Sequence, residues 1–189
     1  MAGRAVCARL RERGDTVIAL GTDAERLASV DATERRVAEL TDPHAVHALA
    51  VSLSAEHRSI DAVLHLVGGW RGGSSEEADA WLRPRLVDTL ANVIASFEDA
   101  LIASEGRLAI VSSTAVEPDA TSSYARAKAD AEELVAELSD RLGVADGAAT
   151  VFAVSAIGDG GTPAAVLAER LVDWIDAPAA AVNGARVIV

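Results

Sequence analysis

The chain has only one cysteine, Cys7, so no internal disulfide can form and a reducing compartment is expected. Cys7 lies on the apolar side of a predicted helix, which favours a packing role over a reactive thiol. Aromatic residues make up only 3% of the chain, so the core has to be built from Ala, Val, Leu and Ile. No apolar run approaches the roughly 18 residues of a membrane span. Arginines also interrupt the first apolar stretch, where a signal peptide would be continuous. We therefore expect a soluble, cytoplasmic protein with no membrane partner.

Positive charge is also scarce, because 17 lysines and arginines stand against 29 acidic residues and give a formal net charge of −12. A negative field of this size repels phosphate backbones and argues against nucleic acid as a partner. It does not exclude a nucleotide cofactor, since backbone N–H groups at the start of a helix attract phosphate locally. We predict no metal site.

A length of 189 residues suits one domain, which we assign to residues 1–189. Short β-branched runs alternate with longer helical ones. The expected strands are 15–20, 35–40, 60–67, 107–112, 148–154 and 185–189, and the expected helices are 3–13, 24–29, 43–57, 76–104, 122–142 and 163–176. Such alternation, with nearly continuous apolar strands, predicts a Rossmann-like α/β fold: a doubly wound parallel sheet between two layers of helices. Ligands bind beyond the carboxyl ends of such strands.

The chain contains one tyrosine, Tyr124, and one lysine, Lys128, and they lie four residues apart on a predicted helix. This spacing places the phenol and the ammonium on one helix face, about one turn apart. A nearby cation favours phenolate and is expected to lower the pKa of a tyrosine, so that it can exchange a proton with a carbonyl or alcohol near neutral pH. The alternative is an exposed helical pair without function.

Two serines, Ser112 and Ser113, end the apolar strand that precedes this helix. A hydroxyl at that position could hydrogen-bond the same carbonyl oxygen that Tyr124 protonates. Ordinary capping of a strand end is the alternative. The sequence does not decide between Ser112 and Ser113.

A strand that ends in Ser-Ser, a loop, and a helix that opens with Tyr-x-x-x-Lys resemble the short-chain dehydrogenase/reductase family. The resemblance extends over nearly the whole chain. It includes the start of the first helix, the stretch after the third strand of the family, the following buried strand and the segment that meets the nicotinamide. The matching segments are Gly3-Arg-Ala-Val, Glu39-Leu-Thr-Asp-Pro43, Asp61-Ala-Val-Leu-His-Leu-Val-Gly68, and Ser155-Ala-Ile157 with Thr162-Pro163.

The resemblance implies an NAD(P)-dependent oxidoreductase that acts on a small-molecule carbonyl/alcohol pair. By this analogy Ser113 orients the substrate, Tyr124 is the acid/base, and Lys128 holds the ribose and tunes Tyr124. The implied cofactor-binding residues are Gly3, Thr22, Glu39, Gly68, Tyr124, Lys128, Ile157 and Thr162.

The first strand of the family, and most of its Thr-Gly-x-x-x-Gly-x-Gly loop, have no counterpart in the sequence. In the strand order of the family that strand lies between the strands that end here at Leu20 and Val67. The resemblance therefore predicts two unpaired strand edges. It also leaves open a second reading, a non-catalytic, degenerate member with a binding or assembly role.

We expect NADP rather than NAD. NAD-preferring members place an acid at the end of the second strand, whereas Leu20 is followed here by Gly21 and Thr22, and Asp23 is predicted to cap a helix. Thr22 could then donate a hydrogen bond to a 2′-phosphate, and Arg4 is the nearest candidate cation.

Three further expectations concern packing. The helices at 76–104 and 122–142 are predicted to build a homodimer or homotetramer, because their apolar residues exceed what one core face needs; examples are Leu90, Val93, Ala129 and Leu134. His65 is interpreted as a packed strand residue rather than a catalytic histidine. Trp70, in a glycine-rich loop, could either stack on a flat substrate ring or pack against the protein.

Overall fold

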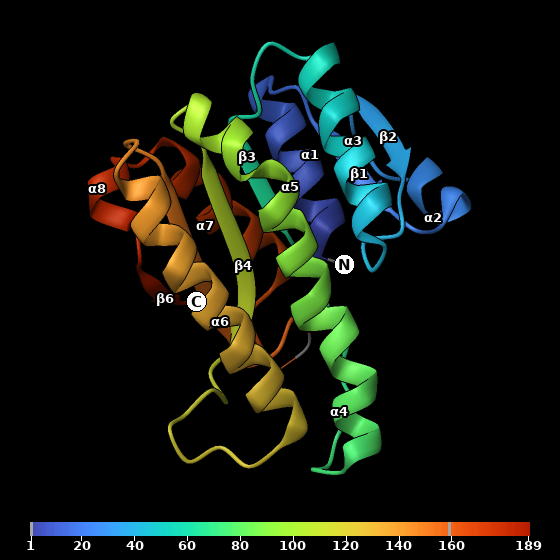
Figure 1. The fold of residues 1–189 in the computed structure, drawn as a ribbon, viewed down its shortest axis with the longest axis vertical. Helices are drawn as coiled ribbons and strands as arrows, with labels where there is room; N and C mark the ends of the chain where they lie inside the picture. The colour runs from blue at the N-terminus through green and yellow to red at the C-terminus, as the bar shows by residue number, and fades with distance from the viewer. Residues whose placement is uncertain (1, 159) are drawn as a thin grey trace.

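The computed structural model describes residues 2–158 and 160–189, and it has three layers, with the strands between two layers of helices (Figure 1). This confirms the α/β class and the parallel strand pairing. In chain order the elements are α1 (Ala2–Arg13), β1 (Ile18–Gly21), α2 (Ala24–Ala28), β2 (Glu34–Val37), α3 (Pro43–Glu56), β3 (Ala62–His65), α4 (Glu76–Arg83), a π-helical segment (Pro84–Asp88), α5 (Thr89–Ala103), β4 (Arg107–Ser113), α6 (Ser123–Gly143), β5 (Ala148–Val154), α7 (Ala164–Asp176), α8 (Ala179–Val182) and β6 (Arg186–Ile188).

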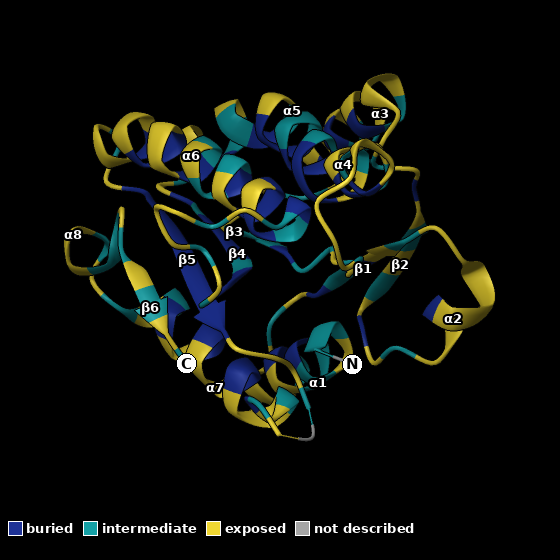
Figure 2. Ribbon diagram, turned by 90° about the horizontal axis from the view of Figure 1, so that it is seen from below, coloured by how far each residue is buried: buried dark blue, intermediate teal, exposed yellow. Residues whose placement is uncertain are grey.

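The described strands form two separate parallel sheets. One sheet has the order β1-β2 and the other the order β3-β4-β5-β6, and β1 does not hydrogen-bond β3. Figure 2 shows β1 and β2 side by side and apart from β3, β4 and β5. The break lies where the resemblance predicted two unpaired strand edges, so that expectation is confirmed.

Backbone groups on β1 point toward this break. The carbonyl oxygens of Val17 and Gly21 accept hydrogen bonds from the β2 side. Since backbone groups alternate in direction along a parallel strand, those of Ile18 and Leu20 point away from β2. Leu20 is 36% exposed rather than buried as the sequence suggested.

The facing edge, on β3, shows the same lack of a partner. The Leu66 N–H donates to Leu64 O only two residues back, at 3.1 Å, which is a local turn contact in place of a ladder bond. Every residue of β5 is buried, whereas His65 is the one buried residue of β3. Strands in the middle of a parallel sheet are normally covered on both faces, so β1 and β3 are half-buried because each lacks one neighbour.

The helical layers continue across the break in the sheet. Helices α3, α4, α5 and α6 lie on one side, with α3 packed against α5, and α1 packs against α7 on the other (Figure 2). Each layer covers its own apolar cluster, one around Phe97 and Leu138 and the other around Val6 and Leu171. Cys7 packs against the second cluster, and burial raises the pKa of its thiol, which agrees with a packing role.

Local signals in the sequence set the helix ends. The Asp42 side chain accepts hydrogen bonds from the N–H groups of His44 and Ala45 at the start of α3. Gly14, with φ of +96°, ends α1 in a backbone conformation that favours glycine. None of the helices in the described ranges is long and apolar enough to cross a membrane.

Four elements differ in their bounds from the sequence prediction, one of them the strand expected at 35–40, which is Glu34–Val37. The strands expected at 15–20 and 60–67 are shorter, at Ile18–Gly21 and Ala62–His65, because each has a partner on one side only. The helix expected at 76–104 is divided by the π-helical segment, which begins at Pro84, since proline has no N–H for the helical ladder. The short helix α8 was not predicted.

Amide hydrogen exchange should show the break directly. We expect the Leu20 and Leu64 amides, which point to it, to exchange at least about a hundredfold faster than the Ile110 and Phe152 amides in the β4–β5 ladder. Mass spectrometry or NMR in D₂O measures this, and equal protection of both pairs would contradict the break.

Candidate functional site

The predicted pair lies in the first two turns of α6. The Ser122 side chain accepts from Ala125 N–H and caps the helix, which fixes where its turns begin. Lys128 Nζ is then 5.9 Å from the centre of the Tyr124 ring. Lys128 is 7% exposed and Tyr124 is half-buried, so the pair is not the exposed helical pair of the alternative reading.

The Lys128 ammonium is held against the end of β4. Its Nζ donates to the carbonyl oxygen of Val111 at 2.7 Å. β3 ends at His65, opposite Ile110, so no described strand residue bonds Val111 O. Burial lowers the pKa of Lys128 to about 8, and the Glu132 carboxylate acts in the opposite direction.

The pKa of Tyr124 differs from the expectation. Burial raises it above the ordinary value, whereas the sequence predicted a lowering by Lys128. The reason is that burial disfavours phenolate, while the lysine charge is directed to Val111 O rather than to the phenol oxygen.

The two serines have different partners. Ser112 Oγ lies 2.5 Å from Glu132 Oε1, so its hydroxyl is occupied by a carboxylate on α6. Ser113 Oγ accepts from Ala115 N–H at 3.1 Å, which leaves its hydroxyl hydrogen free to donate. The geometry therefore favours Ser113 as the serine available to a substrate.

The glycine-rich loop after β3 lies against the start of α6. Ser123 N–H donates to Gly73 O at 3.0 Å. Gly69 passes close to the Trp81 ring, and a Cβ added to this glycine would lie 3.1 Å from the ring, so a larger residue would require the ring to shift. Trp70 is 74% exposed, so its ring is not packed into the core and is accessible to a ligand.

His65 is a packed strand residue, as expected. It is 6% exposed and lies close to Val67, Leu86 and Lys128. Its Nε2 has no hydrogen-bond partner within the part of the chain that the structure describes. Burial, together with the Lys128 charge, lowers the pKa of His65 to about 4, so its ring is neutral at physiological pH.

The remaining predicted cofactor residues fall into two groups. Four follow the carboxyl ends of parallel strands and so lie at one edge of the fold. These are Thr22 after β1, Glu39 after β2, Gly68 after β3 and Ile157 after β5. The other two do not directly follow a strand, and the position of Gly3 at the start of the first helix agrees with the resemblance. Gly3 lies within the first turn of α1, and the Thr162 hydroxyl donates to Val189 O at 2.6 Å.

A group of possible metal ligands lies elsewhere, on β2 and α3. Ligand atoms of Glu34, Glu56 and His57 lie within 4.8 Å of one another. The Arg36 guanidinium bonds both carboxylates, so this group already holds a cation of the chain itself.

The geometry of Lys128 suits a ribose. Its ammonium has three N–H donors and one described acceptor, Val111 O, in a buried position. Two remaining donors can bind the neighbouring hydroxyls of a ribose, beside the Tyr124 phenol. The residues at this end of the site therefore fit a nicotinamide riboside.

No protein-family model and no curated protein matches the chain. Solved structures do match over 100% of its length. One is a short-chain type dehydrogenase/reductase from Mycobacterium ulcerans, with a TM-score of 0.89, 16% identity and 84% of that chain covered. A second is the RhlG/NADP active-site complex of Pseudomonas aeruginosa, with a TM-score of 0.84, 16% identity and 90% of that chain covered. A third is an apo SCOR enzyme from Clostridium thermocellum, with a TM-score of 0.81, 18% identity and 86% of that chain covered. The fold is that of the short-chain dehydrogenases/reductases. At these identities the similarity concerns the fold, and the reaction has to be argued from the residues of the site.

The single lysine and single tyrosine make the site easy to titrate. In protein labelled with ¹³C-lysine and ¹³C-tyrosine, NMR should show one side-chain signal of each kind. We expect the Lys128 signal to titrate near pH 8, well below the ordinary value of about 10.4, and the Tyr124 signal to titrate above about 10. A lysine that titrates above pH 10 would mean that Lys128 is solvated rather than buried.

Proposed function

We propose that the chain is an NAD(P)-dependent oxidoreductase that interconverts a small-molecule carbonyl compound and its alcohol. One observation carries this proposal: the only lysine is buried one helical turn from the only tyrosine, beside the strand end that carries Ser113. Burying an ammonium is unfavourable, and a purpose in chemistry explains it better than packing does. The fold of the matching structures supports the same reaction class.

The site residues have separate tasks in the reducing direction. A bound nicotinamide supplies the hydride. The Tyr124 hydroxyl donates its proton to the carbonyl oxygen, and the Ser113 hydroxyl donates a hydrogen bond to that oxygen and orients it. Lys128 holds the ribose through its remaining donors, and its charge stabilises the phenolate that proton transfer leaves on Tyr124. Oxidation of the alcohol runs through the same groups in reverse.

We also propose NADP as the preferred cofactor. Asp23 Oδ1 accepts from Arg26 N–H as the cap of α2, so its carboxylate is engaged with the helix, and Thr22 is exposed next to it. The Arg4 guanidinium reaches the same helix, where it donates to Ser29 Oγ at 2.6 Å. An exposed hydroxyl at the strand end, together with a cation bonded to the far end of the helix that follows, supports binding of a 2′-phosphate.

We also propose a homodimer or homotetramer, but with an interface made of fewer residues than the sequence suggested. Leu90 and Val93, which the sequence offered as interface residues, are 0% and 3% exposed and belong to the core of this chain. Leu134 is half-buried and Ala129 is exposed, so the outer face of α6 is the surface on which we place the partner copy. A monomeric mass in light scattering at micromolar concentration would contradict this assembly.

Substitution of the phenol tests the mechanism. We expect Tyr124→Phe to reduce NADPH-dependent reduction of a reactive aromatic diketone by at least about a thousandfold, because the proton donor is lost. The melting temperature should change little, since the ring and its packing are kept. Retained turnover in the Phe variant would show that another group donates the proton.

Calorimetric titration tests the cofactor. We expect NADPH to bind more tightly than NADH, and Thr22→Val to weaken the binding of NADPH while leaving that of NADH unchanged. Binding of NADH about tenfold tighter than NADPH would reverse the assignment of the cofactor. No binding of either would exclude the proposed function.

A further inference from the structure

The site face of α6 carries a third polar residue beyond the predicted pair. Glu132 follows Lys128 by four residues, as Lys128 follows Tyr124, so all three lie along one face of the helix. The Glu132 side chain is 15% exposed, and both of its oxygens are bonded. Oε1 is 2.5 Å from Ser112 Oγ, and Oε2 accepts from Arg186 Nε at 2.8 Å. This carboxylate is therefore held in one position.

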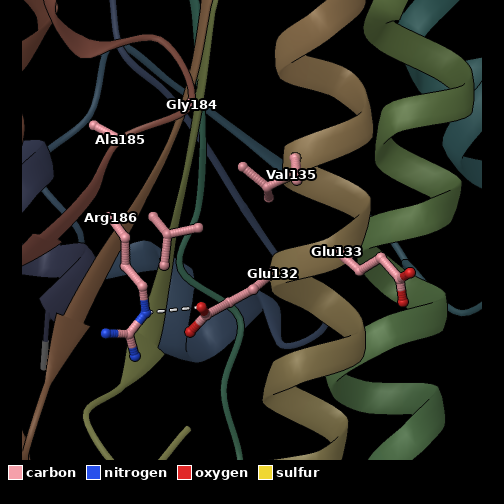
Figure 3. A pocket seen from close by; sticks show the side chains of 8 residues that line it. Glu132, Glu133, Val135, Gly184, Ala185 and Arg186 are labelled. Carbon is pink, nitrogen blue, oxygen red and sulfur yellow. Dashed lines mark hydrogen bonds and ion pairs between the residues drawn. The ribbon is translucent and has the colours of Figure 1, made fainter. Parts of the chain in front are cut away.

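Arg186 connects that carboxylate to the end of the strand beside it. Its Nη2 donates to Ser113 O at 2.9 Å while its Nε binds Glu132. Figure 3 shows Glu132 of α6 directed toward Arg186 of β6, with Glu133 pointing away from them. The ion pair forms one wall of a surface pocket of about 300 Å³ between α6 and β6. Glu132 and Arg186 therefore bond both serines at the end of β4, on the side of the strand that faces β6 and α6.

Few charged groups act on the Lys128 ammonium. From β3 it faces the neutral ring of His65, and from the π-helical segment and α5 it faces apolar Leu86 and Leu90. On its own helix, Tyr124 is uncharged at neutral pH, and Glu132 is the carboxylate that counteracts the effect of burial. Glu132, one helical turn further along, is therefore the carboxylate that favours the charged form of Lys128 against the effect of burial.

We propose that Glu132 is a positioning residue of the site: its carboxylate favours the charged form of Lys128 and holds the serine strand in place without touching substrate or cofactor. Arg186 sets how strongly the Glu132 carboxylate acts on Lys128, because it partly neutralises that carboxylate. The role of this pair in catalysis rests on the proposed function, whereas its effect on Lys128 does not. In this way Arg186, on the edge strand β6, influences the charge of Lys128 through Glu132.

The sign of the effect separates this role from a merely structural one. Loss of the Glu132 charge removes the interaction that opposes burial, so the pKa of Lys128 should fall below about 8. Loosening of the site would instead let water reach Lys128 and raise its pKa toward the ordinary value of about 10.4. The two causes therefore move the titration in opposite directions.

The test is the ¹³C-lysine titration of the intact chain, in which Lys128 gives the one lysine signal. We expect Glu132→Gln to lower the pKa of Lys128 by at least about 0.5. The matched control is Glu133→Gln, which removes the same charge one residue further along from an exposed position that points away from the pair, and it should leave the signal in place. An unchanged or raised pKa in Glu132→Gln, or an equal fall in Glu133→Gln, would overturn the proposal.

A second variant decides the matter if circular dichroism shows that Glu132→Gln does not fold. Arg186→Gln leaves the Glu132 carboxylate without its cation, and the Arg186 side chain, 35% exposed, lies at the surface. The pKa of Lys128 should then rise by at least about 0.5, while hydrogen exchange of the α6 amides stays as slow as in the parent chain, which separates this rise from a loosening of the site. An unchanged or lowered pKa, or a rise that comes with faster exchange of the α6 amides, would overturn the proposal.

Kinetics show whether the pair acts in catalysis. The alkaline limb of kcat/KM should move to lower pH in Glu132→Gln by the same amount as the lysine titration, which at pH 8 amounts to about a twofold loss. NADPH calorimetry is run on the same samples. Absence of cofactor binding would exclude the proposed function while the titration still tests Glu132, and an unmoved titration in an active enzyme would exclude only the role of Glu132.

Discussion

The unequal length of two neighbouring strands is the constraint on which the site depends. β3 ends at His65, opposite Ile110, whereas β4 continues to Ser113. A buried carbonyl without a partner is unfavourable by roughly 1–3 kcal/mol, so the exposed end of the β4 ladder has to be satisfied by something other than a strand. The ammonium of Lys128 provides that hydrogen bond for Val111 O. The same bond fixes Lys128 beside the serines. One hydrogen bond therefore satisfies the free carbonyl of the sheet and also sets the position of the lysine in the site.

Burial of the Lys128 ammonium lowers the stability of the folded chain by an amount that depends on pH. The pKa of Lys128 is about 8 in the folded chain and near 10.4 in an unfolded one. Below pH 8 both states are protonated, and the charged group lowers stability by an amount of about 3 kcal/mol at most. As the pH rises from 8 to 10.4 the unfolded state binds more protons, so stability increases over that window. The hydrogen bond to Val111 O offsets part of this cost in the folded chain, where Lys128 is 7% exposed.

Local patterns in the sequence predicted the parts of the fold that depend on neighbours along the chain. The cap at Asp23 and the helix that carries Tyr124 and Lys128 are read from residue types and their spacing along the chain, and the structure has them. The break between the sheets came from the resemblance rather than from periodicity. Other features depend on contacts between distant segments and left no signal. Arg186 reaches Glu132 across 54 positions, and the burial that raises the pKa of Tyr124 depends on packing, not on its distance from Lys128. Glu132 could have been noticed, because it continues the four-residue spacing of the pair.

The break in the sheet divides the site into two halves, one held by a well-packed sheet and the other by a two-stranded sheet. Ser113, Tyr124 and Lys128 belong to β4 and α6, which pack against the fully buried β5. Thr22 and Glu39, the residues on the side expected to meet the adenosine, follow β1 and β2, a two-stranded sheet with no ladder hydrogen bond to the four-stranded sheet. A two-stranded pair has little stability of its own, so the position of that half depends on α3 and α1, which bridge the break by packing against α5 and α7. The reacting end is thus organised before any ligand binds. Ligands that contact both halves, as a dinucleotide does, should tighten the fold more than ligands that contact the reacting end alone.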